Sequence, residues 1–201
     1  VAAAAGMHAN GATWSPDGSR LAWVSEAPGW YSVFVSQGSA EPITDGEGDY
    51  SELAWSPDGS RLVATRTLRG RTDLVVIDPH SGGVEVLSGG GSWSDPAWLP
   101  DGSVVAVYED HATPARIEKV GADGTRHVVF DPTPAAVTTA PHVHLEDVTY
   151  PSFDGLEIHG FLLRPALADS ERVAAVVYPH GGPTSLYGDE WDGYAQYFVD
   201  K

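Results

Sequence analysis

A ten-residue motif occurs three times in the first half of the chain, and this repeat constrains the fold more than any other feature. Residues 14–23 read Trp-Ser-Pro-Asp-Gly-Ser-Arg-Leu-Ala-Trp, and residues 55–64 repeat them with changes only at the last two positions. Residues 98–107 keep the Trp and the Pro-Asp-Gly-Ser core. The copies start 41 and 43 residues apart. Such a period indicates an array of one repeated supersecondary unit.

Each unit is predicted to contain about four short strands. A β-prone run ends at the Trp, Pro-Asp-Gly forms a tight turn, and further β-prone runs follow. The predicted strands are Ala12–Trp14, Arg20–Val24 and Tyr31–Val35, and then Leu53–Trp55, Arg61–Thr65, Asp73–Ile77 and Val84–Leu87. Four strands in about 40–45 residues are typical of a β-propeller blade.

The count gives three blades, over residues 11–48, 51–91 and 94–131, within a propeller segment of residues 1–131. Because a closed propeller typically uses about 4–8 blades, we expect either further blades before residue 1 or closure by another chain. We interpret the recurring Trp as packing between blades rather than as a ligand platform. The recurring Asp is interpreted as a turn residue, because one isolated carboxylate per blade cannot enclose a metal ion.

After the repeats the pattern of the sequence changes. Residues 132–144 read as a Pro-containing interdomain linker, and the segment 145–201 is predicted to start another domain. That segment is predicted to contain a hairpin of Leu145–Tyr150 and Leu156–Leu163, a buried strand Val173–Tyr178, a glycine loop, and a helix Asp189–Lys201. The apolar face of this helix is expected to comprise Trp191, Tyr194, Ala195, Phe198 and Val199.

The combination of motifs resembles the prolyl oligopeptidase family of serine peptidases, in its acylaminoacyl-peptidase or dipeptidyl-aminopeptidase branch. The resemblance rests on the Trp-Ser-Pro-Asp-Gly blades, on residues 148–162, and on Tyr-Pro-His-Gly-Gly-Pro-Thr-Ser at residues 178–185. It implies a partial β-propeller of four-stranded antiparallel blades, followed by the N-terminal part of an α/β-hydrolase domain. It also implies a short peptide as substrate, a propeller that gates the active site, and no cofactor.

The glycine loop carries the only site residues that the resemblance assigns. A backbone N–H aimed at the developing oxyanion stabilises the transition state of acyl transfer. The resemblance places this donor at Gly182, with His180, Gly181 and Pro183 shaping the loop. His180 is expected to be structural or to face the substrate, because the catalytic His of this fold follows the nucleophile in sequence. The alternative interpretation is a glycine-rich turn without a ligand.

The catalytic triad is not present in these 201 residues. No Gly-x-Ser-x-Gly sequence occurs, and the nearest approach, residues 90–94, lacks the last Gly and lies in a blade. The nucleophile, acid and base are therefore expected after Lys201, so that this chain alone is expected to be an inactive fragment whose partner is the remainder of the same enzyme. The alternatives are an esterase or amidase of the same fold, and a non-catalytic propeller that binds a partner.

Composition excludes several kinds of site. The absence of Cys excludes disulfides, thiolate metal sites and a Cys nucleophile. A formal charge of −17 disfavours binding to nucleic acid and to anionic membranes. His142 and His144 could together face a metal ion, but no third ligand lies near them, so we predict an interdomain polar contact and no metal site. A cytoplasmic location is expected, because no apolar run approaches the ~20 residues of a membrane span.

Overall fold

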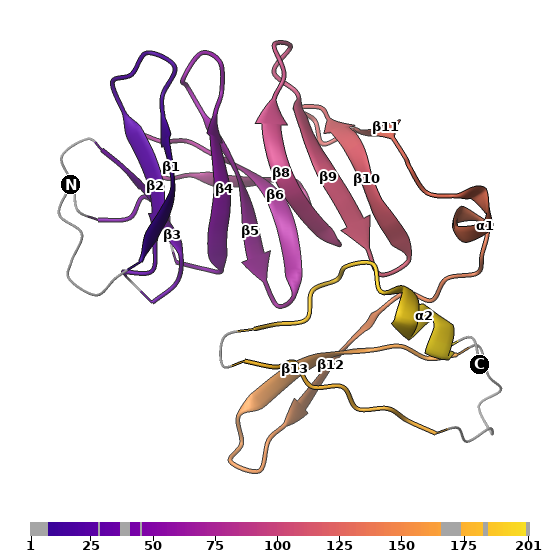
Figure 1. Cartoon of the computed structure of the whole chain (residues 1–201). Helices are drawn as coiled ribbons and strands as arrows, with labels where there is room; N and C mark the ends of the chain where they lie inside the picture. The colour runs from indigo at the N-terminus through magenta and orange to yellow at the C-terminus, as the bar shows by residue number, and fades with distance from the viewer. Residues whose placement is uncertain are drawn as a thin grey trace.

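The structure is a computed structural model that describes residues 8–27, 29–36, 41–44, 46–165, 174–182 and 185–199 (Figure 1). It consists of a row of antiparallel blades and a smaller C-terminal part at one end of the blades. The blade strands are β1 (Ala9–Trp14), β2 (Leu21–Ser25), β3 (Ser32–Val35), β4 (Asp49–Trp55), β5 (Leu62–Leu68), β6 (Arg71–Ile77), β7 (Val84–Ser88), β8 (Ser92–Trp98), β9 (Val104–Asp110), β10 (Thr113–Val120) and β11 (Arg126–Phe130).

These strands form three consecutive blades, as the repeat predicts. The first blade has the strand order β1-β2-β3, and residues 37–40, which follow it, lie outside the described residues. The second blade (β4–β7) and the third blade (β8–β11) are each four strands connected in sequence. A single parallel pair, Thr72 with Ser92, joins these two blades. The predicted outer strand at Val84–Leu87 is confirmed as β7.

The Pro-Asp-Gly turns have the chemistry that the sequence predicts. Gly18, Gly59 and Gly102 have φ values of 69°, 70° and 80°, a region that side chains disfavour and glycine tolerates. The Asp58 carboxylate accepts hydrogen bonds from the Ser56 hydroxyl at 2.6 Å and from the Ser60 N–H at 3.0 Å. These hydrogen bonds lower the Asp58 pKa to about 2. The repeated Asp is therefore explained by the turn.

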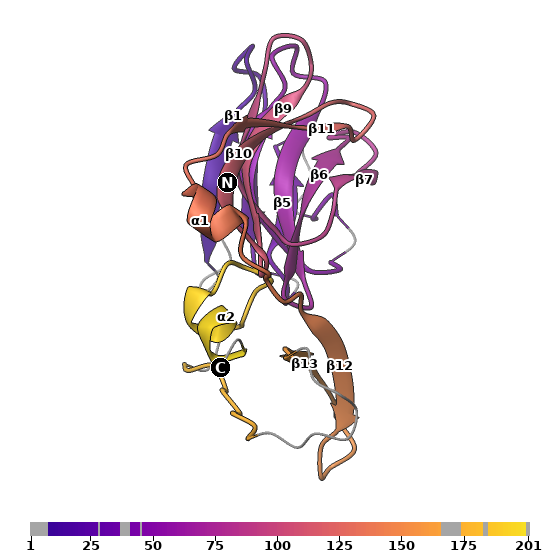
Figure 2. The same cartoon turned by 90° about the vertical axis from the view of Figure 1, so that its right-hand side faces the viewer.

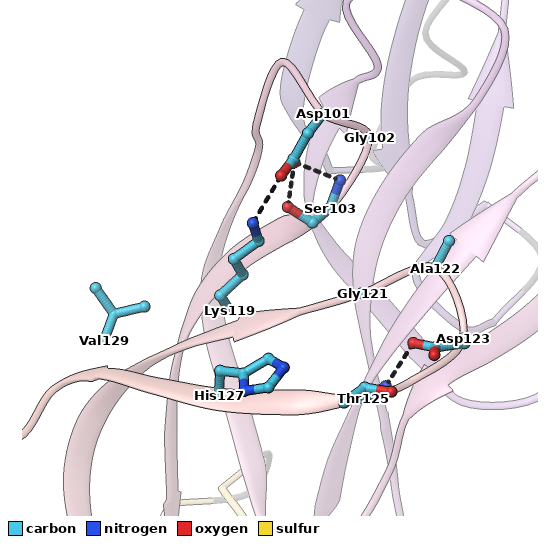
Figure 3. A pocket seen from close by; sticks show the side chains of 10 residues that line it. All are labelled: Asp101, Gly102, Ser103, Lys119, Gly121, Ala122, Asp123, Thr125, His127 and Val129. Atoms are coloured by element: carbon cyan, nitrogen blue, oxygen red, sulfur yellow. Dashed lines mark hydrogen bonds and ion pairs between the residues drawn. The ribbon is translucent and has the colours of Figure 1, made fainter.

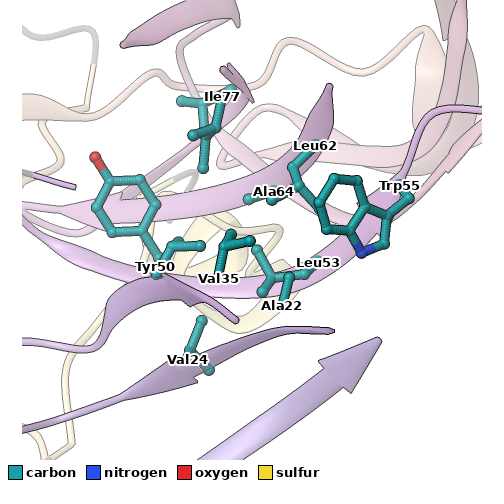
Figure 4. Close-up of a cluster of buried hydrophobic side chains, with 11 residues drawn as sticks. Ala22, Val24, Val35, Tyr50, Leu53, Trp55, Leu62, Ala64 and Ile77 are labelled. Carbon is teal, nitrogen blue, oxygen red and sulfur yellow. The ribbon is translucent and has the colours of Figure 1, made fainter. Parts of the chain in front are cut away.

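Two apolar clusters fill the spaces between successive blades. Alternation along β5 sends Leu62 and Ala64 to the cluster shared with the first blade, and Val63 to the cluster shared with the third blade. Figure 4 shows the first of these clusters, where Val24 and Val35 of the first blade face the strands of the second. The second blade is thus buried on both faces.

The repeated Trp links each blade to the preceding one. The Trp55 Nε1–H donates to the main-chain oxygen of Thr13 at 3.1 Å, and the Trp98 Nε1–H donates to that of Ala54 at 3.1 Å. Both acceptors immediately precede the Trp of the preceding blade. Trp55 is only 8% exposed, whereas Trp14 is 62% exposed, because no described blade packs on that side. Packing between blades is confirmed for Trp55, and the expectation fails for Trp14.

A further repeated feature was not predicted from the sequence. The first strand of each blade bulges three residues before the Trp, at Gly11, Glu52 and Asp95, where the pairing register shifts. All three have φ between 51° and 62°. The Asp95 N–H donates to the Glu52 carboxylate at 2.9 Å, so the bulges of the second and third blades are connected. The three equivalent positions carry Gly, Glu and Asp. Because they share no residue type, the repeat in the sequence does not reveal the bulge.

The C-terminal part contains a hairpin of β12 (Glu146–Pro151) and β13 (Glu157–Leu162), in agreement with the sequence. Its two helices are short, α1 (Ala135–Thr138) inside the predicted linker and α2 (Gly193–Val199) near the end of the chain. None of the helices in the described residues is long and apolar enough to cross a membrane.

Two predictions about this part are wrong. Residues 174–178 of the predicted strand Val173–Tyr178 form no ladder with any described strand, and Val177 is 89% exposed. A buried strand needs neighbours for its main-chain groups, and β12 and β13 pair only with each other. The predicted helix from Asp189 begins only at Gly193, and Tyr194 and Phe198 of its expected buried face are exposed. Val173 and Lys201 lie outside the described residues.

Replacement of Trp55 tests the link between blades. We expect Trp55→Phe to cost about 1 kcal/mol or more through the lost hydrogen bond, and Trp55→Ala about 3–5 kcal/mol through the cavity. Urea unfolding of the 201-residue chain measures both. Trp14→Phe is the matched control at the same repeat position and should leave the unfolding midpoint unchanged. Equal losses at Trp14 and Trp55 would contradict this account.

Candidate functional site

The predicted oxyanion loop lies on the surface of the C-terminal part. Gly182 has φ 65°, and a side chain placed there would meet only the Ser185 Cβ, at 3.9 Å. The N–H of Gly182 donates to no acceptor within the described residues. The backbone conformation therefore favours a glycine here, and no described group occupies its N–H. Pro183, the fourth residue assigned to the loop, lies outside the described residues.

Aromatic side chains connect this loop to the segment that follows it. The rings of Tyr178 and Tyr187 lie 5.3 Å apart, and the His180 ring lies 6.3 Å from that of Tyr187. The His180 Nδ1 also lies 3.2 Å from the main-chain oxygen of Gly181. His180 is thus exposed and contacts Tyr187 and its own loop.

The segment after the loop is anchored to the tip of the β5–β6 hairpin in the second blade. The Asp189 N–H donates to the main-chain oxygen of Gly70 at 2.7 Å. The Arg71 guanidinium donates to the carboxylates of Asp147 at 2.7 Å and Asp189 at 3.2 Å. Hydrogen bonds from Arg71 and His159 lower the Asp147 pKa to about 2, so this carboxylate stays ionised.

A second hairpin tip, between β9 and β10 of the third blade, holds the same segment. His111, in this tip, is 6% exposed. The His111 main-chain N–H donates to the Asp189 carboxylate at 3.0 Å, and the His111 Nδ1 lies 3.1 Å from the Glu190 main-chain oxygen. Burial lowers the pKa of His111, although Asp192 and the Glu190 carbonyl act in the opposite direction. The imidazole is therefore held neutral, with the proton on Nδ1.

Gln196 completes this contact from helix α2. Its amide N–H groups donate to the main-chain oxygens of His111 at 2.8 Å and Val143 at 2.7 Å, and its amide oxygen accepts from the Val143 N–H at 2.9 Å. Gln196 is the buried residue of α2. The helix is therefore docked by a polar side chain, whereas the sequence predicted an apolar face.

The paired histidines of the linker differ in their surroundings. The His142 Nε2 lies 2.7 Å from the main-chain oxygen of Val137, and its ring packs edge-on against Trp191 at 4.8 Å. His144 is exposed. Within the described residues no group of three or more His, Asp or Glu is arranged to hold a metal ion. The printed contacts of His142 lie within the linker and the C-terminal part, and neither involves a propeller blade.

A cavity of about 600 Å³ lies elsewhere, on the third blade (Figure 3). It is lined by Asp101, Lys119, His127 and neighbours from that blade alone. Lys119 Nζ and the Asp101 carboxylate pair at 2.6 Å, and Asp101 also accepts from Ser103. The charged groups of this cavity thus satisfy one another, and no described residue connects it to the His180–Gly182 loop.

The two hairpin tips and the segment of the C-terminal part that they hold form a junction between the blades and that part. The residues of this junction were not identified from the sequence. Arg71, His111 and Asp189 come from three separate turns or loops that no sequence motif links. One signal was available, since the Arg69-Gly70-Arg71 sequence has no counterpart in the other blades. The structure brings these residues to one end of the propeller, next to β12 and α2 (Figure 2).

Comparisons with known proteins agree with the blades and with the arrangement of the two parts. The profile of the TolB beta propeller domain family matches residues 4–135. Acylaminoacyl peptidase from Pyrococcus horikoshii is 18% identical with a TM-score of 0.74, over 92% of this chain and 30% of that protein. A puromycin-hydrolyzing peptidase from Mycobacterium tuberculosis is 19% identical with a TM-score of 0.72, over 96% of this chain and 32% of that protein.

Porphyromonas gingivalis dipeptidyl peptidase 4 is 18% identical with a TM-score of 0.70, over 94% of this chain and 29% of that protein. The chain thus spans about a third of the length of these proteins. No curated protein matches the sequence.

Removal of the Gln196 side chain tests how α2 is docked. We expect Gln196→Ala to weaken the docking of α2 by about 1–3 kcal/mol, because the main-chain groups of the half-buried Val143 and the buried His111 lose their partner. Hydrogen exchange of residues 193–199 measures the loss. Tyr194→Ala removes a side chain that is 82% exposed on the same helix and should leave exchange unchanged. If the two variants behave alike, polar docking is excluded.

His111 predicts a pH dependence of stability. Because its folded pKa is lowered, the unfolded state binds more protons as the pH falls below about 6.5, and the folded state loses stability there. We expect the urea midpoint of the wild type to fall more steeply from pH 7.5 to 5.5 than that of His111→Asn, which does not titrate and keeps a donor near the Nδ1 position. Identical slopes would show that His111 is not held neutral by burial.

Proposed function

The chain belongs to the TolB beta-propeller domain family, and we propose that its propeller serves a serine peptidase of the prolyl oligopeptidase type. Under this proposal residues 1–131 are propeller blades, 132–144 are the linker, and 145–201 start the α/β-hydrolase domain. The nucleophile, acid and base lie after Lys201. The substrate is a short peptide, cleaved by acylation and deacylation of the serine.

One observation carries the proposal: a loop with a glycine in the left-handed region, whose N–H has no acceptor among the described residues, followed by a segment that is anchored to the blades. The Gly182 conformation and its free N–H are suited to an oxyanion. The anchoring of Asp189 by two hairpin tips, a few residues after this loop, supports a position of the loop near the blades. The structural similarity to three peptidases over more than nine-tenths of the chain supports the same arrangement.

The Gly182 N–H would supply one donor of the oxyanion hole in this mechanism. As the serine attacks the scissile carbonyl, negative charge gathers on its oxygen, and a preorganised N–H stabilises it by about 2.7–4 kcal/mol. His180 and Gly181 shape the loop, with Tyr187 packed against His180. The blades would then restrict access, so that short peptides reach the serine and folded proteins do not.

The finer assignment is an aminopeptidase or acylaminoacyl peptidase, acting in the cytoplasm and without a cofactor. A second candidate is a non-catalytic propeller that binds a partner. It is favoured by the family match, which ends at residue 135 and includes none of the loop. Hydrolysis of aminoacyl or acyl-peptide chromogenic substrates by the full-length protein distinguishes the two, and simple esters as comparison substrates test for an esterase.

Substitution of the loop glycines tests the oxyanion assignment. We expect Gly182→Ala in the full-length protein to lower kcat about tenfold, because the left-handed backbone costs a non-glycine residue roughly 1–2 kcal/mol and the N–H moves. Gly181→Ala should lose much less, since no atom lies within 4 Å of the added Cβ and its φ is not positive. A larger loss at Gly181 than at Gly182 would contradict the placement of the donor.

A further inference from the structure

We propose that Arg71, in the second blade of the propeller, is a positioning residue for the oxyanion loop, which it supports through Asp189 and Tyr187. This inference rests on the proposed function for its catalytic consequence, whereas its structural part stands on the contacts alone. The contacts run in sequence from the β5–β6 turn to His180, which lies two residues before Gly182.

The β5–β6 turn is inserted into the C-terminal part. Arg69 and Gly70, its two central residues, both have positive φ, of 52° and 74°, and Gly70 is buried. A Cβ at Gly70 would lie 2.7 Å from the Phe161 ring and 2.7 Å from the Tyr187 main-chain oxygen. Only a glycine permits this approach, so the turn contacts β13 on one side and the segment after the oxyanion loop on the other.

Arg71 joins these two sides through one guanidinium group. Its Nη1 lies 2.7 Å from Asp147 of β12, its Nε lies 3.2 Å from Asp189, and the group lies 5.3 Å from the centre of the Phe161 ring. The Asp189 side chain is only 11% exposed, so its pairing is shielded from solvent. A planar group with several donors can bridge two carboxylates, whereas the point charge of Lys cannot reproduce both contacts.

The anchored segment leads directly to the loop. Tyr187 lies two residues before Asp189, and its ring contacts those of Tyr178 and His180. His180 is in turn two residues from Gly182. A shift of Asp189 would therefore move Tyr187. The Tyr187 ring packs against the rings of both Tyr178 and His180.

The surrounding charge makes Arg71 necessary for this arrangement. Asp147, Asp189, Glu190 and Glu109 all lie at the junction, and the mutual repulsion of Glu109 and Glu190, together with burial, raises the Glu190 pKa. Without Arg71, Asp147 would keep only its contact with His159, and Asp189 only the His111 N–H, in a chain whose formal charge is already −17. Separation of β12 from residues 187–190 is the expected relaxation.

The first readout needs no enzymatic activity. In the full-length protein we expect Arg71→Ala to speed hydrogen exchange of the Asp189 amide, which donates to the Gly70 main-chain oxygen, by about tenfold or more, the effect of losing one charge-assisted hydrogen bond. Exchange in β6 (Arg71–Ile77) beyond the turn should not change, which controls for unfolding of the blade. Arg69→Ala is the matched control, because it removes the same charge from the same turn and Arg69 makes no ion pair with any described residue. Equal exchange in the two variants overturns the inference.

The second readout is catalytic. We expect Arg71→Ala to lower kcat for a short chromogenic peptide by about tenfold, with KM nearly unchanged, below the 10²–10³-fold cost of deleting an oxyanion donor. Arg71→Lys should recover part of the loss and Arg69→Ala should match the wild type. Faster exchange with an unchanged kcat would overturn the positioning role. If the wild type hydrolyses no substrate, the proposed function fails, and the exchange data still decide whether Arg71 anchors the loop.

Discussion

The indole N–H that one blade donates to the main chain of the preceding blade is the contact on which the rest of the structure depends. This hydrogen bond fixes how far each blade is displaced along its strands relative to the preceding blade, because Trp55 and Trp98 donate to equivalent carbonyls. With the blades in register, the β5–β6 and β9–β10 turns reach the same end of the propeller (Figure 1). The apolar clusters then fill the space that these contacts define.

The two aligned turns give the C-terminal part its position. Blade packing is apolar, whereas this junction is polar and charged, with Arg71, His111 and Gln196 as its main donors. The strength of a polar junction depends on the geometry of its hydrogen bonds and on the protonation of its side chains. A change in one side chain can therefore alter it. The junction includes Asp189, and Tyr187 two residues before it contacts His180, so under the proposed function the stability of the junction would affect the geometry of the oxyanion loop.

The blades could be predicted from the sequence and the junction could not, for a physical reason. A tight turn depends on the local preferences of Pro, Asp and Gly, and the alternation in β5 depends on neighbours along one strand. Both are visible in sequence. Arg71 and Asp189 lie more than a hundred residues apart, and Gln196 is buried on a helix whose aromatic residues are exposed. The predicted strand at Val173–Tyr178 failed similarly, because strand formation depends on partner strands.

Labelling with a fluorophosphonate probe tests the central claim, that this propeller and its loop serve a serine hydrolase. The full-length protein is treated with the probe, digested, and analysed by mass spectrometry. The account predicts one labelled serine, within a Gly-x-Ser-x-Gly sequence C-terminal to Lys201, and slower labelling in Gly182→Ala. A protein that carries no such sequence and remains unlabelled would contradict it and would favour a propeller that only binds.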